Sequence, residues 1–115
     1  NDFKLSDTTK GFIAGTIKTL SDSELALYEV DKNERDIFTG DLKNVSNNQF
    51  GAAYATTLIV TANRIYQKHG PEASSFFFKS LPEIEYRQSD GKPLKIKAFA
   101  MLEFNRLKNK SLNNR

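Results

Sequence analysis

Residues 46–71 read SNNQFGAAYATTLIVTANRIYQKHGP, and this stretch decides the fold. Ser46 and Gln49 have the spacing of a capping box, in which each side chain bonds a free backbone N–H group at the start of a helix. Apolar residues then recur every three or four positions, as they do on the buried face of a helix. The closing Gly-Pro pair is typical of a helix end. The stretch therefore predicts a central helix over about 47–69.

A first helix is predicted after Ser6, whose hydroxyl can accept a backbone N–H bond from the next turn. Apolar residues at helical spacing follow from Ile13. Gly11 and Gly15 lie within this helix, where each glycine costs about 1 kcal/mol relative to alanine. Because they are four residues apart, they either let another element approach closely or simply weaken the helix.

A second capping box is formed by Ser21 and Glu24. Apolar residues at helical spacing continue beyond it, so we expect one helix that runs from Ser21 until Gly40 ends it. A short strand over 25–30 is the alternative, because that part of the segment lacks a clean helical period.

Three consecutive phenylalanines, Phe76, Phe77 and Phe78, lie in the helix predicted to begin at Pro71 and to stop before Leu81. Three consecutive residues cannot all share one face of a helix. We expect these rings to belong mainly to the core. At least one of them should contact a different neighbour or lie at the surface, where it is a candidate contact for a partner.

The last quarter of the chain combines strand and helix signals. Polar and apolar residues alternate over 83–90, and the Asp-Gly pair at 90–91 is a strong hairpin turn. Pro93 suits the start of a helix, and good helix formers follow it. We expect an extended passage over 83–90 and then a helix over about 93–108. A two-stranded hairpin within 83–98 is the alternative.

These elements predict an all-α or predominantly α fold, with four or five helices around the helix at about 47–69. The chain has 115 residues, of which 38% are hydrophobic and 27% charged, and these values are typical of one globular domain. We therefore expect a single helical domain over 1–115. Its basic end over 108–115 is expected to fray. No stretch has the length and apolar character of a transmembrane helix.

Tests for chemistry find no assembled site in the sequence. The chain has no cysteine, which excludes disulfides, thiolate metal sites and thiol nucleophiles. His69, the single histidine, stands at the predicted end of the central helix, where it can interact with the last carbonyl groups. The carboxylate pairs Glu83 with Glu85 and Asp31 with Glu34 lack a specific spacing. We expect no catalytic residue, no metal site and no cofactor.

The net charge of +3 hides an uneven distribution. Residues 92–115 carry seven Lys or Arg and one acidic residue, whereas residues 21–41 carry seven acidic residues and two basic ones. The basic end is expected either to meet an anionic partner or to complement the acidic segment within the same domain.

These features favour a non-enzymatic protein-binding module, such as a small inhibitor, an immunity-type protein, an adaptor or a secretion accessory protein. Its partner is expected to be another protein with an acidic face. A nucleic-acid-binding accessory protein that uses the same basic segment is the alternative. The candidate contact residues are Lys95, Lys97, Arg106, Lys108 and Lys110, together with whichever of Phe76, Phe77 and Phe78 is exposed.

The chain begins at Asn1, and Met101 is its single methionine. We therefore expect an N-terminal segment to have been removed, either as an export signal or by trimming before expression. Removal of an export signal would place the protein in the periplasm, and a cytoplasmic location is the alternative.

Overall fold

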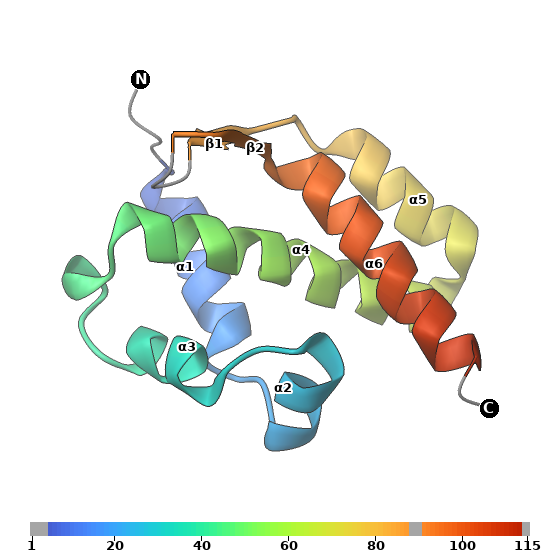
Figure 1. Ribbon diagram of the computed structural model, residues 1–115, viewed down its shortest axis with the longest axis horizontal. Coiled ribbons are helices and arrows are strands. Elements are labelled where there is room, and N and C mark those ends of the chain that lie inside the picture. The colour runs from blue at the N-terminus through green and yellow to red at the C-terminus, as the bar shows by residue number, and fades with distance from the viewer. Residues whose placement is uncertain (1–4, 88–90, 114–115) are drawn as a thin grey trace.

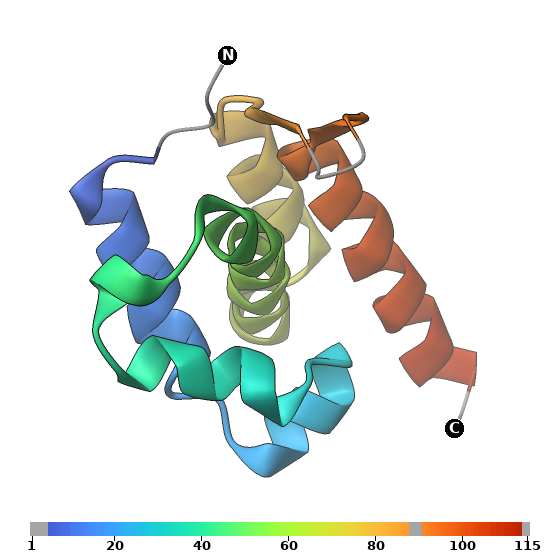
Figure 2. The same cartoon turned by 60° about the vertical axis from the view of Figure 1, so that its left-hand side comes forward.

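The computed structural model describes residues 5–87 and 91–113, which form a predominantly helical fold around one long central helix (Figure 1). Figure 2 shows this central helix, α4, nearly end-on, with α1 and α3 on one side and α5 and α6 on the other. The predicted fold class is confirmed. In chain order the elements are α1 (Asp7–Ile17), α2 (Asp22–Tyr28), α3 (Lys32–Asp36), the short 3-10 helices η1 (Ile37–Thr39) and η2 (Leu42–Asn44), α4 (Asn47–His69), α5 (Pro71–Ser80), β1 (Glu85–Arg87), β2 (Pro93–Lys95) and α6 (Ile96–Asn113).

Both ends of α4 follow from local chemistry. The Ser46 hydroxyl accepts the N–H of Gln49 at 3.1 Å, and the N–H of Ser46 donates to the Gln49 side chain at 2.8 Å. These two bonds satisfy donors for which the helix itself has no acceptor. At the other end, Gly70 has a φ of 92°, which strains any residue with a side chain, and Pro71 opens α5. The predicted bounds of α4 are confirmed.

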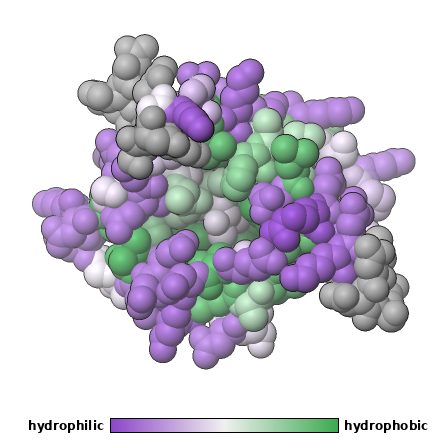
Figure 3. Space-filling view, in the orientation of Figure 1, coloured by the Kyte–Doolittle hydropathy of each residue, from purple (hydrophilic) through white to green (hydrophobic). Residues whose placement is uncertain are grey.

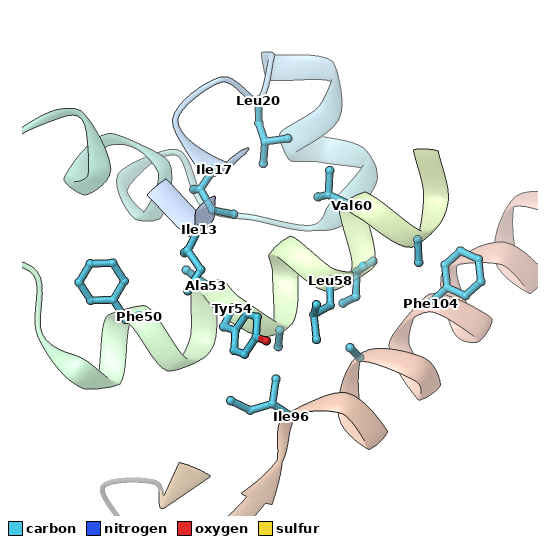
Figure 4. Packing of buried hydrophobic residues seen from close by; sticks show 14 of the residues in the cluster. Ile13, Ile17, Leu20, Phe50, Ala53, Tyr54, Leu58, Val60, Ile96 and Phe104 are labelled. Carbon is cyan, nitrogen blue, oxygen red and sulfur yellow. The ribbon is translucent and has the colours of Figure 1, made fainter. Parts of the chain in front are cut away.

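The core lies on two sides of α4 (Figure 4). Ile13 and Ile17 of α1 are buried against one side, and Ile96 and Phe104 of α6 are buried against the other. Thr57 lies in α4 with no exposed surface, and its hydroxyl donates to the carbonyl of Ala53 at 2.7 Å, one turn earlier. A bonded hydroxyl in the core avoids the penalty for burying an unpaired polar group. Helix α4 is therefore buried over more than the single stripe that its spacing predicts.

The segment 21–40 is not the single helix that we predicted. Helix α2 ends at Glu29, which adopts the left-handed conformation (φ 60°, ψ 42°) and turns the chain. The Asp31 side chain then accepts the N–H of Asn33 at 2.8 Å and caps a new helix, α3. The turn lets Val30 pack against the core. The alternative of a strand in this segment is also wrong, since α2 occupies it. This break explains why the described residues contain six α-helices.

Strands β1 and β2 form an antiparallel hairpin in which Tyr86 lies opposite Leu94. The hairpin that we considered as the alternative is therefore the structure that forms. Pro93 begins β2 and does not begin a helix, because the chain must first pair with β1. Helix α6 starts at Ile96 and continues to Asn113, beyond the predicted range of 93–108. It includes the first part of the basic end, and residues 114–115 lie outside the described residues.

The cap of α6 comes from a distant side chain. The Glu83 carboxylate accepts the N–H groups of Lys97 at 2.9 Å and Ala98 at 3.2 Å. The N–H of Ile96 donates to the carbonyl of Ile84 at 3.0 Å, so the chain before β1 covers the whole start of the helix. A carboxylate suits this place because the start of a helix carries partial positive charge. Glu83 therefore has a structural role that its pairing with Glu85 in sequence did not suggest.

One glycine of α4 is required by packing. A Cβ atom on Gly51 would lie only 2.8–3.0 Å from the ring of Tyr86. The Tyr86 hydroxyl donates to the Asn48 side chain at 2.6 Å, so the hairpin is attached to the first turns of α4. By contrast, a Cβ atom on Gly11 or Gly15 would meet nothing within 4 Å. The close approach that the spacing of these two glycines suggested does not occur.

Replacing Gly51 by alanine should destabilise the protein by about 1–3 kcal/mol, because the new methyl group overlaps the buried Tyr86 ring. The matched control is Gly15→Ala, which should stabilise the protein by about 1 kcal/mol through helix propensity alone. Urea denaturation followed by circular dichroism measures both changes. Equal stabilisation by the two substitutions would contradict the proposed contact.

Replacing Glu83 by alanine should lower the free energy of unfolding by about 1–2 kcal/mol, because the N–H groups of Lys97 and Ala98 lose their acceptor. Glu85→Ala removes an exposed carboxylate from the adjacent strand and should change the free energy by less than about 0.5 kcal/mol. The same urea titration compares the two variants. A loss of equal size in both would show that Glu83 does not act as a cap.

Candidate functional site

A furrow crosses α4 between α3 and the hairpin. Two hollows, with volumes of about 370 and 440 Å³, lie side by side in it, the first toward α3 and the second toward the hairpin. Both are lined by Asn48, Ala52 and Thr56, which are four residues apart and form the floor, and by Glu34 of α3. Figure 3 shows apolar side chains gathered over the middle of this face, with polar residues around them. The furrow is therefore the third side of α4, which neither α1 nor α6 covers.

The two walls of the furrow come from segments that are far apart in the sequence. Val30 and Ile37, beside and after α3, line the first hollow. Tyr86 and Leu94, which face each other across the hairpin, line the second hollow together with Phe99 of α6. The Phe99 side chain keeps 39% of its surface exposed. Both walls therefore present mainly apolar groups to the floor.

The charge along the furrow is negative. A third hollow, of about 310 Å³, continues past Ile37 and is lined by Asp36 and Asp41. Asp36 accepts a bond from the Arg35 side chain, and Asp41 accepts the N–H of Lys43. The Glu34 carboxylate has no ion pair or hydrogen bond within the described residues. Among the described residues, three carboxylates and no Lys or Arg line the three hollows.

The acidic segment and the basic end meet at Glu29. Its carboxylate accepts bonds from Arg106 at 2.7 Å and from Lys110 at 3.3 Å. Arg106 also bonds Glu103, one turn earlier on α6, at 2.9 Å. The bonds from Arg106 and then from Lys110 lower the pKa of Glu29 below its ordinary value of 4.5. For these two cations, the expectation that the basic end complements the acidic segment is confirmed.

The other basic candidates are spread along α6. The Lys97 ammonium donates to the carbonyl of Leu81 at 3.0 Å. The Lys108 ammonium lies 5.2 Å from the ring centre of Tyr66 and 5.4 Å from that of Phe104. Lys95 is exposed on β2. The structure places Lys95 and Lys97 at the start of α6 and the other three cations near its end, so the five do not form one patch.

The three phenylalanines of α5 have different environments. Phe78 is only 2% exposed and packs in the core, with its ring centre 5.9 Å from that of Phe104. Phe77 is partly buried beside Phe78. Phe76 is 70% exposed. Phe76 is therefore the ring that remains available to a partner, while Phe78 is a core residue.

Groups with possible chemistry are dispersed. Within residues 5–87 and 91–113, no three His, Cys, Asp or Glu side chains gather where they could hold a metal ion. His69 is exposed in the last turn of α4, while Asp31 and Glu83 accept backbone N–H groups as caps. Among the helices of this same part of the chain, none combines the length and apolar character needed to cross a membrane.

Sequence reasoning missed the furrow, although one signal for it is present. The central helix has no charged residue from Asn47 to Asn63, which spans more than four turns. A helix with one solvated face normally carries charges on that face. Here the uncovered positions are Asn48, Ala52 and Thr56, which indicates a face that is only partly solvated. The contribution of Phe99 could not be read from α6 alone, because its neighbour across the furrow is distant in sequence.

No protein-family model matches this chain, and neither a curated protein nor a solved structure was found to be similar to it. The candidate site therefore stands on its own geometry.

The ion pairs of Glu29 should contribute stability only above acidic pH. Because the pKa of Glu29 is lowered in the folded chain, this contribution is fully present above the ordinary value of 4.5 and is lost as the pH falls through the folded value. Glu29→Gln should therefore reduce stability at pH 7 and make the decline toward pH 3 shallower than in the wild type. Urea midpoints at the two pH values test this.

The control for this experiment is Glu72→Gln, which removes an exposed carboxylate from the first turn of α5. It should keep the steeper acid decline of the wild type. Equal slopes for Glu29→Gln and the wild type would mean that the bonds to Arg106 and Lys110 do not couple to folding.

Proposed function

We propose that this chain is a non-catalytic protein-binding module, of the kind that serves as an inhibitor, an immunity-type protein, an adaptor or a secretion accessory protein. The furrow across α4 is the observation that supports this proposal. Its floor and walls leave apolar surface in contact with water, and covering such surface is favourable by roughly 25 cal/mol per Å². A partner that fills the furrow gains this free energy.

Exposed apolar side chains beside the furrow extend the contact surface. Leu102 follows Phe99 by one turn of α6, so both side chains lie on the same side of the helix. Leu102 is 69% exposed. Together with Phe99, it continues the apolar wall of the second hollow along α6, and a contiguous exposed apolar surface is typical of an interaction site.

The basic residues have a secondary part in this proposal. Arg106 and Lys110 already neutralise Glu29, and Lys97 is bonded to a backbone carbonyl. The excess positive charge over residues 92–115 then attracts an acidic face of the partner at long range, with Lys95 as a direct contact. We assign specific recognition of the partner protein to the furrow.

Nucleic acid is a poorer fit to the same surface. Phosphate groups need cations at the contact, and the affinity for DNA grows with the number of phosphates that are neutralised. The furrow is lined by carboxylates, and the basic side chains are spread along α6 and partly paired. These observations favour a protein partner over the nucleic-acid alternative.

The proposal is tested with the full chain as immobilised bait in a lysate of its source organism. We expect one protein to be retained at a stoichiometric level, and to be lost with Ala52→Arg, which fills the floor of the furrow. Ser75→Arg places the same side chain on the exposed face of α5 and should retain the protein.

In parallel, the chain is titrated with duplex and single-stranded DNA at low and moderate salt.

Two results would overturn the protein-binding function. One is that the immobilised wild-type chain retains no protein from the lysate. The other is tight DNA binding at low salt that weakens steeply as salt is added, since this salt dependence is typical of phosphate contacts.

A further inference from the structure

We infer that the furrow across α4 binds a basic amphipathic helix of the partner protein, and this inference rests on the proposed protein-binding function. The helix would lie along the floor formed by Asn48, Ala52 and Thr56, with apolar side chains in the hollows and a Lys or Arg at Glu34.

Charge complementarity is the first argument. The chain has 17 Lys or Arg against 14 acidic residues, yet the described residues that line the three hollows include three carboxylates and no cation. Glu34 lines both larger hollows and has no partner within the described residues. An exposed, unpaired carboxylate at the rim of apolar hollows favours a ligand that combines a cation with apolar side chains, because covering it without a cation would leave the charge desolvated and unpaired.

The arrangement of the hollows is the second argument. The floor from Asn48 to Thr56 spans eight residues of helix, or about 12 Å at 1.5 Å per residue, which is the length of two helical turns. Each of the two hollows is lined by all three floor residues, so the hollows lie on either side of the floor, the first toward α3 and the second toward the hairpin. Apolar side chains three positions apart on a helix laid along the floor diverge to either side of its contact line, so one can enter each hollow. The small side chain of Ala52 in the middle of the floor allows a close helix approach.

The polar character of the backbone is the third argument. A helix satisfies its own backbone hydrogen bonds, whereas an extended segment buried in an apolar furrow leaves N–H and C=O groups without partners. Tyr86, Leu94 and Phe99 line the second hollow, and these apolar side chains supply few partners for the backbone of such a segment. A helical occupant therefore fits this surface better than an extended one.

A second copy of this chain is a poorer occupant. Its long basic helix, α6, keeps the apolar stripe of Ile96, Ala100 and Phe104 in the core of its own domain, and its exposed Phe99 already lines its own furrow. The helix that the furrow receives must come from a segment whose apolar face is still uncovered, and such a segment belongs to another protein.

The probe is an 18-residue synthetic peptide with Leu along one helical face and Lys flanking it. A second peptide has Glu in place of every Lys, and hexylammonium serves as a small apolar cation. Each is titrated into the ¹⁵N-labelled full chain and followed by NMR. We expect the Lys peptide to shift the amide signals of Asn48, Ala52 and Thr56. It should bind at least about tenfold more tightly than the Glu peptide and than hexylammonium.

Variants locate the contact. Glu34→Gln should weaken the Lys peptide by about threefold to fivefold, the range for one exposed ion pair. Ala52→Arg should weaken it by more than about tenfold, because the new side chain both fills the floor and repels the peptide. Glu72→Gln and Ser75→Arg lie on α5 and should bind as the wild type does. Dispersed NMR spectra verify that each variant is folded.

Several outcomes would overturn this inference. They are equal affinity for the Lys and Glu peptides, shifts that map to α5 instead of the furrow, or hexylammonium binding as tightly as the peptide. Absence of binding at about 1 mM peptide, the weak end of specific association, overturns it as well. A cellular protein retained equally by the wild type and by Ala52→Arg would leave the protein-binding function standing and reject the furrow alone. If no protein is retained, both fail.

Discussion

The structure depends on burying a long helix that carries no charge over most of its length. From Asn47 to Asn63, α4 offers no group that must stay in water. Burial of its apolar surface therefore dominates the packing, with α1 on one side and α5 and α6 on the other. Thr57 shows how the one polar exception at the centre is accommodated, because its hydroxyl bonds the preceding turn. The side left uncovered is the furrow.

The turn at Glu29 determines where the acidic segment lies. A left-handed conformation is unfavourable for a residue with a side chain, by roughly 1–2 kcal/mol. At this position the same residue closes α2 through its backbone and bonds Arg106 and Lys110 through its carboxylate. The turn redirects the chain so that α3 forms one wall of the furrow. The acidic segment and the basic end are thereby paired with each other through Glu29. The Glu34 carboxylate is left without a partner in the described structure.

The carboxylates illustrate why isolated acidic residues in a sequence are weak evidence for catalysis. Glu24, Asp31 and Glu83 each accept a backbone N–H group at the start of a helix. These groups are already committed to donors that a helix end cannot otherwise satisfy. Glu83 is the instructive case, since it serves a helix that begins thirteen residues later, beyond an intervening hairpin. Its neighbour Glu85, which pairs with it in sequence, has a separate environment on β1.

Features that depend on neighbours three or four positions apart were determined by the sequence itself. The capping boxes at Ser21 and Ser46, the end of α4 at Gly70 and the helix through the phenylalanines are of this kind, because their hydrogen bonds form within one turn. Tertiary structure alone decided the late start of α6 and the exposure of Phe76 rather than Phe78, and it adds to the local bonds at Glu29 the ion pairs with Arg106 and Lys110. These depend on contacts between distant segments, which local propensity does not encode. The furrow belongs to the second group, since its floor, its acidic wall and its aromatic wall meet only after the chain has folded around α4.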